Sequence, residues 1–273
     1  MNRRLLVIAT TLATLLLGSA LAQEDNLLQR YDLAIENLQI AVASVPNDGL
    51  QARDELERAL NALLTLSTNA TSPTLVQAMD RTRVAIENQS RTDMAVQTSV
   101  LAGGFARLVM DSALTAAAVG ETELARTRLN HLATSLGFDA EAQAALNSAS
   151  NAAEMRLAFE AGAADAVNAD VQAALELVGT DRAAAYERLA AAYGESLLVQ
   201  DSPRATPALN RSLVDAANAL VGADMDAAET ALEAASTNLT NLAAQARGAE
   251  PVVAPLQPQS QEQQPATTPP ATA

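Results

Sequence analysis

The stretch VGETELARTRLNHLATSL, residues 119–136, decides the fold of this chain. It opens on a glycine turn and continues with apolar residues at helical spacing. Two later stretches, which begin at Val178-Gly179 and at Val221-Gly222, follow the same design. In all three an Ala stands five positions after the Gly, with a Leu one helical turn or slightly more beyond it: Ala125 and Leu129, Ala184 and Leu189, Ala227 and Leu232. Each stretch predicts a helix end, a tight turn and a second helix that folds back.

The composition favours helices throughout. Hydrophobic residues make up 49% of the chain but aromatic residues only 2%, and most of the apolar content is Ala and Leu. Ala and Leu are strong helix formers, whereas strands prefer β-branched and aromatic residues. Because an Ala buries little area, we expect a thin, extended core. The sequence predicts an all-α domain, residues 23–247, of about ten helices in antiparallel hairpins. They form either an irregular solenoid or a bundle.

Punctuation residues divide this domain into helices. We expect helices over residues 25–44, 50–66 and 93–119, with Gly103-Gly104 marking a kink or a close helix contact in the third. Asp139 is expected to cap a helix that reaches Glu160, and Gly162 to break it before three more segments end near Leu198. Cap-and-proline pairs at Ser72-Pro73 and Thr206-Pro207 predict two further helix starts. The last hairpin is expected over residues 206–221 and 224–246.

Gly120, Ala125 and Leu129 resemble the turn and second helix of a tetratricopeptide repeat. The resemblance covers only the three hairpins named above, and it implies helical hairpins without implying any binding residue. The spacing departs from the family, because Gly120 to Gly179 is 59 positions and Gly179 to Gly222 is 43, whereas the repeat has about 34. The family's first-helix aromatic signature is also missing.

The N-terminus has the features of a secretion signal. Asn2-Arg3-Arg4 is a short basic region, residues 5–17 are apolar, and Ala20-Leu21-Ala22 fits a cleavage site. We expect residues 1–22 to be removed, which leaves Gln23 as the first mature residue; a retained N-terminal anchor is the alternative. No later segment is expected to be long and apolar enough to span a membrane. The expected destination is the periplasm or the exterior of a bacterial cell.

The C-terminal residues 248–273 differ in composition from the rest of the chain. They are rich in Pro, Gln, Thr and Ala and contain little that could build a core. The sequence predicts a disordered, partly extended tail.

The charge of the chain limits its partners. All 17 basic residues are Arg, and the formal net charge of −15 becomes −17 when Arg3 and Arg4 are lost with the signal. An acidic chain is repelled by nucleic-acid phosphates and by anionic lipid headgroups. We therefore expect neither nucleic acid nor bare membrane as a partner.

Missing residue types exclude several chemistries. Without Lys there is no phosphate-loop lysine and no Schiff base, and with 0 Cys there is no thiol nucleophile and no thiolate metal site. His131 is the one histidine and points away from the stripe of Ala125, Leu129, Leu132 and Leu136, so we expect a solvated surface residue. The sequence predicts no catalytic, cofactor-binding or metal-binding residue.

Three functions remain open. The first is a non-catalytic envelope scaffold that binds another envelope protein. The second is a carrier whose Ala- and Leu-lined helices enclose an apolar small molecule. The third is a hydrolase that uses carboxylates alone, although its acidic residues mostly fall on predicted polar helix faces. The oligomeric state cannot be predicted from the sequence.

Overall fold

The computed structural model describes residues 26–64 and 73–248. Throughout these residues the regular structure is helical and there is no strand, so the prediction of an all-α chain is confirmed. The predicted signal peptide, the Ser72 cap and all of the predicted tail except Gly248 lie outside the described residues.

The helices follow one another with short connections. The first helix covers residues 26–44. The others are α2 (Gly49–Leu64), α3 (Pro73–Glu87), α4 (Arg91–Ala118), α5 (Thr122–Ser135), α6 (Ala140–Ser148), α7 (Ala152–Leu177), α8 (Arg182–Ser196), α9 (Pro207–Gly222) and α10 (Met225–Ala246). The predicted last hairpin corresponds to α9 and α10, and Pro207 occupies the first turn of α9 as expected.

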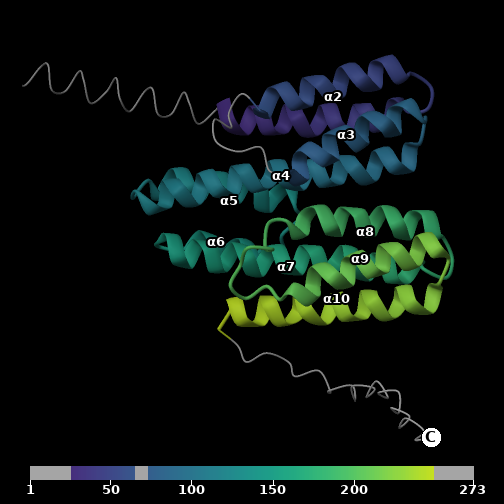
Figure 1. The fold of residues 1–273 in the computed structure, drawn as a ribbon. Helices are drawn as coiled ribbons and strands as arrows, with labels where there is room; N and C mark the ends of the chain where they lie inside the picture. Colours follow the sequence, from purple (N-terminus) through teal and green to yellow (C-terminus); the bar gives the residue numbers. More distant parts are fainter. Residues whose placement is uncertain (1–25, 65–72, 249–273) are drawn as a thin grey trace, which may run out of the picture.

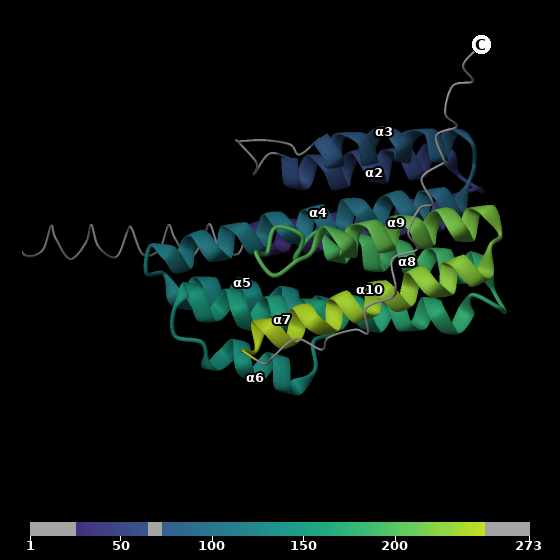
Figure 2. The ribbon, with the colours of Figure 1, turned by 60° about the horizontal axis from the view of Figure 1, so that its bottom comes forward.

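Two long helices, α4 and α7, form the centre of the molecule. Helix α4 packs against α3, α5 and α8, and α7 packs against α6, α8 and α10. Figures 1 and 2 show α2 and α3 at one edge of the molecule and α10 toward the opposite edge. The pairs α4–α8 and α7–α10 join helices that are distant in sequence. The arrangement is consistent with either a helical bundle or a solenoid-like fold.

Helices α4 and α8 cross at two glycines. A Cβ atom added to Gly103 would lie 1.9 Å from the Gly194 carbonyl oxygen, and one added to Gly194 would lie 2.2 Å from the Ser99 oxygen. Backbone therefore meets backbone at this crossing, which only residues without a side chain allow. These distances confirm the close helix contact that was expected at Gly103-Gly104. The helix is not interrupted there, since α4 runs from Arg91 to Ala118.

The predicted break at Gly162 is wrong. Gly162 lies inside α7, where its missing side chain makes room for the Phe138 ring; an added Cβ would lie 2.3 Å from that ring. The helix that Asp139 caps ends at Ser148. A new helix begins after Asn151, whose side chain accepts a hydrogen bond from the Glu154 backbone N–H. The helix boundary therefore lies at the N-cap Asn151, and Gly162 allows the Phe138 ring to pack against α7.

The three repeated turns are present in the structure. The buried positions that follow them coincide when they are counted from the N-cap, but not when they are counted from the glycine. Ala125 is buried, whereas Ala184 is half-buried and Ala227 is exposed. The buried residues are those four and eight positions after each N-cap: Ala125 and Leu129 after Glu121, Ala185 and Leu189 after Asp181, and Ala228 and Leu232 after Asp224. The predicted burial of Ala125 and Leu129 is confirmed, and the sequence pattern of the later two turns is one position out of step with their buried Ala residues.

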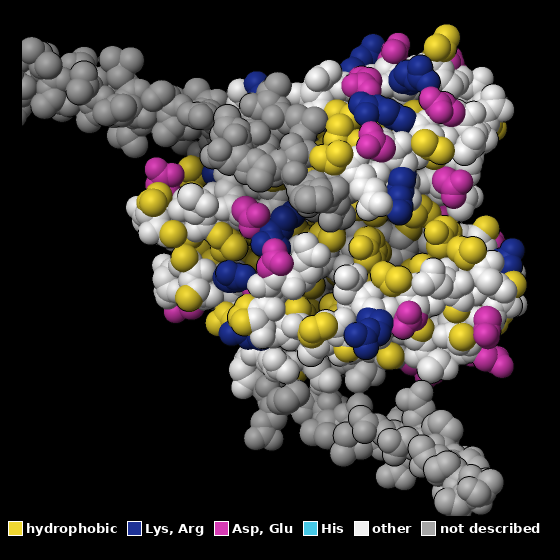
Figure 3. All heavy atoms as spheres, in the orientation of Figure 1, with side chains coloured by type: hydrophobic (Ala, Val, Ile, Leu, Met, Phe, Trp, Pro, Cys, Tyr) yellow, Lys and Arg dark blue, Asp and Glu magenta, His cyan; other side chains and the backbone are white. Residues whose placement is uncertain are grey.

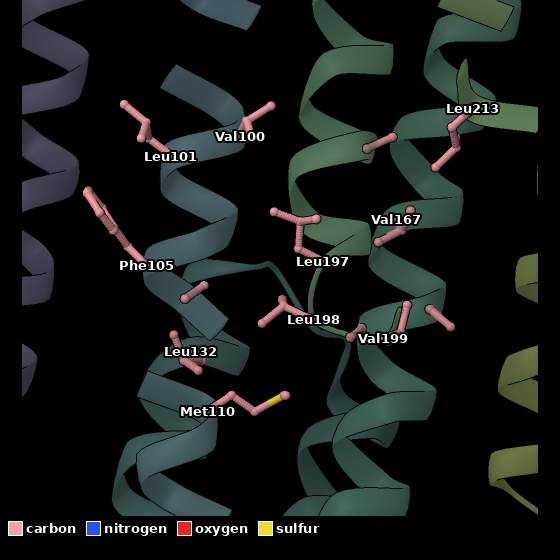
Figure 4. Packing of buried hydrophobic residues seen from close by; sticks show 14 of the residues in the cluster. Val100, Leu101, Phe105, Met110, Leu132, Val167, Leu197, Leu198, Val199 and Leu213 are labelled. Atoms are coloured by element: carbon pink, nitrogen blue, oxygen red, sulfur yellow. The ribbon is translucent and has the colours of Figure 1, made fainter. Parts of the chain in front are cut away.

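The core runs through the whole described chain, from Tyr31 in the first helix to Ala243 in α10. Figure 4 shows Met110 of α4 extending to the side on which the segment Leu197–Val199 lies, after α8, whereas the Phe105 ring points to the other side of α4. All three residues of this segment are buried. A connection after a helix therefore contributes core side chains as well as a change of direction.

Helix α4 contradicts the expectation that no later segment is long and apolar enough to cross a membrane. Among the described residues it alone meets both criteria, and 56% of its apolar window is buried inside the protein. Its apolar side chains pack against α3, α5 and α8. These contacts are those of a core helix.

Candidate functional site

A surface groove lies where α3, α4, α8 and α9 converge, and we call it the tyrosine groove. Its volume is about 230 Å³. Tyr186 and Tyr193 of α8 stand seven positions apart, which places them on one face of that helix. The remaining lining residues are Gln77, Ala78, Arg81, Val96, Gln97, Val100, Leu189, Ala190, Leu213, Val214, Ala217 and Asn218.

The groove combines an apolar floor with a polar rim. Val100, Leu189 and Leu213 are buried and belong to the core, so the floor is continuous with the interior of the protein. Val214 is 42% exposed although it is apolar. In Figure 3 hydrophobic side chains gather over the region where α4, α8 and α9 lie. Exposed apolar side chains rimmed by polar ones are typical of interaction sites.

Charges of opposite sign lie near the Tyr186 hydroxyl. Burial raises the pKa of Tyr186, and the Asp93 carboxylate raises it further, whereas Arg81 lowers it. The hydroxyl is therefore a neutral hydrogen-bonding group in the groove at physiological pH.

A second pocket, which we call the acidic pocket, lies between the first helix, α4, α5 and α8. Its volume is about 340 Å³. Three carboxylate residues line it: Asp32 and Glu36 from the first helix and Glu195 from α8. The other lining residues are Tyr31, Ile35, Gln39, Ser99, Ala102, Gly103, Ala106, Ser135, Leu136 and Ala191.

His131 is held at the edge of this pocket. Its Nε2 atom lies 2.6 Å from Asp32 Oδ1, and its ring meets the Tyr31 ring edge-on with centroids 6.0 Å apart. The side chain is 30% exposed. His131 does point away from the buried stripe of α5, but the first helix covers that side. It is thus a partnered residue rather than the freely solvated one that the sequence suggested.

Burial keeps the Glu195 carboxyl of the pocket partly protonated at neutral pH. It raises the pKa of Glu195 to about 7, and the nearby Asp170 carboxylate contributes to the increase. Burial also raises the pKa of Tyr31 to about 12, with further increases from Asp32 and Glu195. Asp170 itself has a raised pKa because of burial, although Arg188 lies 3.2 Å away and opposes the shift.

A buried carboxylate outside both pockets has a structural role. Glu160 in α7 is 3% exposed and accepts hydrogen bonds from Arg156 at 2.8 Å, Ser202 at 2.9 Å and Arg204 at 3.3 Å. These bonds fix the connection between α8 and α9 against α7. With all of these partners in place, Glu160 offers no free acid for chemistry.

No site residue was predicted from the sequence, although the positions of the tyrosines could have indicated the two pockets. All three tyrosines of this aromatic-poor chain line one of the two pockets. The spacing of Tyr186 and Tyr193 was visible in the sequence. The meeting of Asp32 with His131 was not, because the two residues are 99 positions apart.

Within the described residues, no three His, Asp or Glu side chains gather closely enough to hold a metal ion. The chain matches no protein-family model, no curated protein and no solved structure.

Proposed function

We propose that this chain is an exported, non-catalytic helical protein that binds another envelope protein through the tyrosine groove. The observation that carries the proposal is the groove itself, which opens to the surface and whose lining includes two tyrosines and the exposed Val214. Tyrosine is enriched in protein interfaces because it presents a large apolar face together with a hydroxyl.

The groove suits one anchoring side chain of a partner. Its volume of about 230 Å³ is below the ~300–1,000 Å³ that encloses a drug-sized ligand. A Leu, Met or Phe side chain of the partner would pack between Tyr186 and Tyr193. The neighbouring backbone would reach the amide groups of Gln97 and Asn218. A few anchors of this kind supply most of the free energy of a protein interface.

The charge of the chain favours a partner segment that is neutral or basic. The net charge of −15 repels an acidic partner and steers a basic one toward the surface. We therefore propose a segment with one large apolar residue flanked by Arg or Lys. We place this segment on another exported protein because residues 1–22 are predicted to be a secretion signal.

The other two hypotheses draw less support from the geometry. A carrier of a large apolar molecule needs an enclosed apolar cavity, whereas the groove is small and open. An acid-only hydrolase needs two carboxylates on either side of a substrate bond, with different pKa values. Carboxylates do line the acidic pocket, but Asp32 is engaged by His131.

Site-specific photo-crosslinking in cells tests the proposal. A photoreactive residue replaces Gln97 at the rim of the groove, and in a matched variant it replaces Glu187, an exposed residue of α8 that does not line the groove. We expect one reproducible adduct with an exported protein from position 97 and none from position 187. The linked peptide of the partner should contain a large apolar residue beside a basic one.

Three results would contradict the proposal. They are no adduct from position 97, equal adducts from both positions, or an adduct only to the chain's own C-terminal residues. The last result would mean that the tail, rather than a partner, occupies the groove.

A further inference from the structure

We propose that the acidic pocket binds a small organic ammonium ion, with its charge beside Glu195 and its apolar part against Ile35 and Leu136. This site lies outside the tyrosine groove and does not depend on the function proposed for that groove. Three features of the pocket support this assignment: the charge of its lining, the two polar groups Tyr31 and Glu195 and the shape of its floor.

The lining carries negative charge without a compensating arginine. Asp32, Glu36 and Glu195 supply three carboxylates, and among the described residues no Arg lines the pocket. His131 lies at the edge and is bound to Asp32. A cation in this position would be attracted by several carboxylates, and the attraction is strengthened where water is partly excluded.

Among the pocket's polar side chains that are not exposed, Tyr31 and Glu195 have no side-chain hydrogen-bonding partner within the described residues. Tyr31 is only 5% exposed, and no hydrogen bond satisfies its hydroxyl. Glu195 is half-buried and likewise accepts no hydrogen bond and forms no ion pair. Neither group is among the side-chain atoms that are both sealed from solvent and without a partner. Solvent therefore reaches both groups, and a ligand that displaces this solvent can bond to them.

The other hydroxyl groups of the pocket are already engaged. Ser99 donates to the Ala95 carbonyl oxygen, and Ser135 donates to that of His131. The acceptors that remain deepest in the pocket for an ammonium group are therefore the Glu195 carboxylate and the Tyr31 oxygen, while the exposed Asp32 and Glu36 carboxylates lie at its outer side. The Tyr31 ring adds a face that attracts cations.

The floor of the pocket accepts an apolar group. Ala102, Ala106 and Gly103 of α4 and Ala191 of α8 leave space because their side chains are small. The glycine crossing that brings α4 and α8 together thus also shapes this floor. A volume of about 340 Å³ is enough for a compact organic ion. Since no metal-binding group of three acids or histidines forms here, an organic cation fits the lining better than a metal ion.

Ammonium binding should depend on pH through Glu195. Its pKa of about 7 means that the carboxyl is half protonated at neutral pH, and a bound cation requires the ionised form. The groups that face it are Asp170 from α7, paired with Arg188, and Tyr31, Asp32 and Glu36 from the first helix. No charged side chain of α4 or α9 lines the pocket, and His131 of α5 is bound to Asp32 at its edge. Affinity should therefore rise about tenfold between pH 6 and pH 8.

Calorimetric titration of the full-length mature protein with benzylammonium chloride tests the proposal. Benzyl alcohol serves as the neutral isostere, at constant ionic strength. We expect saturable binding of benzylammonium at pH 8 with a dissociation constant of about 1 mM or tighter, and none of benzyl alcohol. In NMR spectra the ring signals of Tyr31 should shift, while those of Tyr186 and Tyr193 should not.

Three variants localise the effect. Glu195→Gln should weaken binding at pH 8 about tenfold and remove the rise between pH 6 and pH 8. Glu187→Gln, on the exposed side of the same helix, should leave both unchanged. His131→Gln should retain the rise, because Glu195 is still present.

The inference is overturned if benzyl alcohol binds as well as benzylammonium, or if benzylammonium shows no saturable binding. It is equally overturned if Glu195→Gln, shown to be folded by its helical circular dichroism, binds as tightly as the original protein. Removal of a carboxylate with an unfavourable burial cost should not prevent folding, so that control is attainable.

Discussion

At the residue scale, the fold depends on where side chains are absent as much as on where they are present. Gly103 and Gly194 allow the backbones of α4 and α8 to come into contact, and Gly162 leaves room for the Phe138 ring. The acidic pocket lies beside the first of these contacts. The buried Glu195 there is a group whose charge the fold disfavours. Both features lead to measurable consequences.

Substitution of Gly103 by Ala should destabilise the protein by about 3 kcal/mol, because the new methyl group would overlap the Gly194 backbone and push α4 from α8. Gly179→Ala is the matched control, since nothing lies within 4 Å of its added Cβ. It should change stability by less than about 0.5 kcal/mol. Chemical denaturation measures both values. Equal effects of the two substitutions would contradict the close crossing.

Glu195→Gln should stabilise the protein at alkaline pH. The folded pKa of about 7 lies above the usual value of 4.5, so the folded protein holds a proton that the unfolded chain has released. Stability from this group is complete below pH 4.5 and is lost as the pH rises to about 7. The free energy of unfolding of the original protein should therefore fall between pH 4 and pH 8 by about 2 kcal/mol more than that of the variant.

Urea denaturation at pH 4 and pH 8 gives this difference, and Glu187→Gln is the control for loss of one negative charge. If the stability of Glu195→Gln fell with rising pH as steeply as that of the original protein, Glu195 would not be the group with the raised pKa.

At the scale of the element, the repeated hairpins share a cap-based register. In the first turn Gly120 has a φ of +89°, whereas in the third the left-handed residue is Ala223, with a φ of +58°, and Gly222 ends α9. The glycine of the Val-Gly pair is therefore the left-handed turn residue in the first hairpin, but the last residue of the helix in the third. What the repeats have in common is the N-cap and the buried residues four and eight positions after it.

Ala223→Gly should stabilise the protein by about 0.5 kcal/mol, because glycine adopts the left-handed conformation without the steric cost that alanine has there. Gly120→Ala should have the opposite effect and destabilise by about 1 kcal/mol. Thermal unfolding of the two variants tests the pair. If Ala223→Gly destabilised the protein, the difference in register between the two turns would be wrong.

The sequence predicted those features of the elements that depend on local physics. Helix class, the α9–α10 hairpin and the buried Ala125, Leu129 and Leu132 follow from propensity, caps and periodicity. The boundary at Asn151 was missed because Gly162 carries a breaker signal that a tertiary contact with Phe138 overrides. Helix propensity is a weak determinant beside such packing.

At the scale of the whole molecule, both candidate sites arise from pairings that are distant in sequence. The tyrosine groove needs α3 and α4 beside α8 and α9, and the acidic pocket needs the first helix beside α5 and α8. Periodicity gives the face of each helix but not its partner, so neither site could be predicted. The α4–α8 crossing that joins the two sets of helices positions both sites.

The most direct test of the proposed function is the affinity of the crosslinked partner for two α9 variants. Val214 lines the groove and Val221, seven positions later, does not, yet both are exposed valines on the same helix. We predict that Val214→Arg weakens binding by about tenfold or more, because a charge enters the apolar groove, and that Val221→Arg leaves it unchanged. Equal affinity of the two variants would contradict the account.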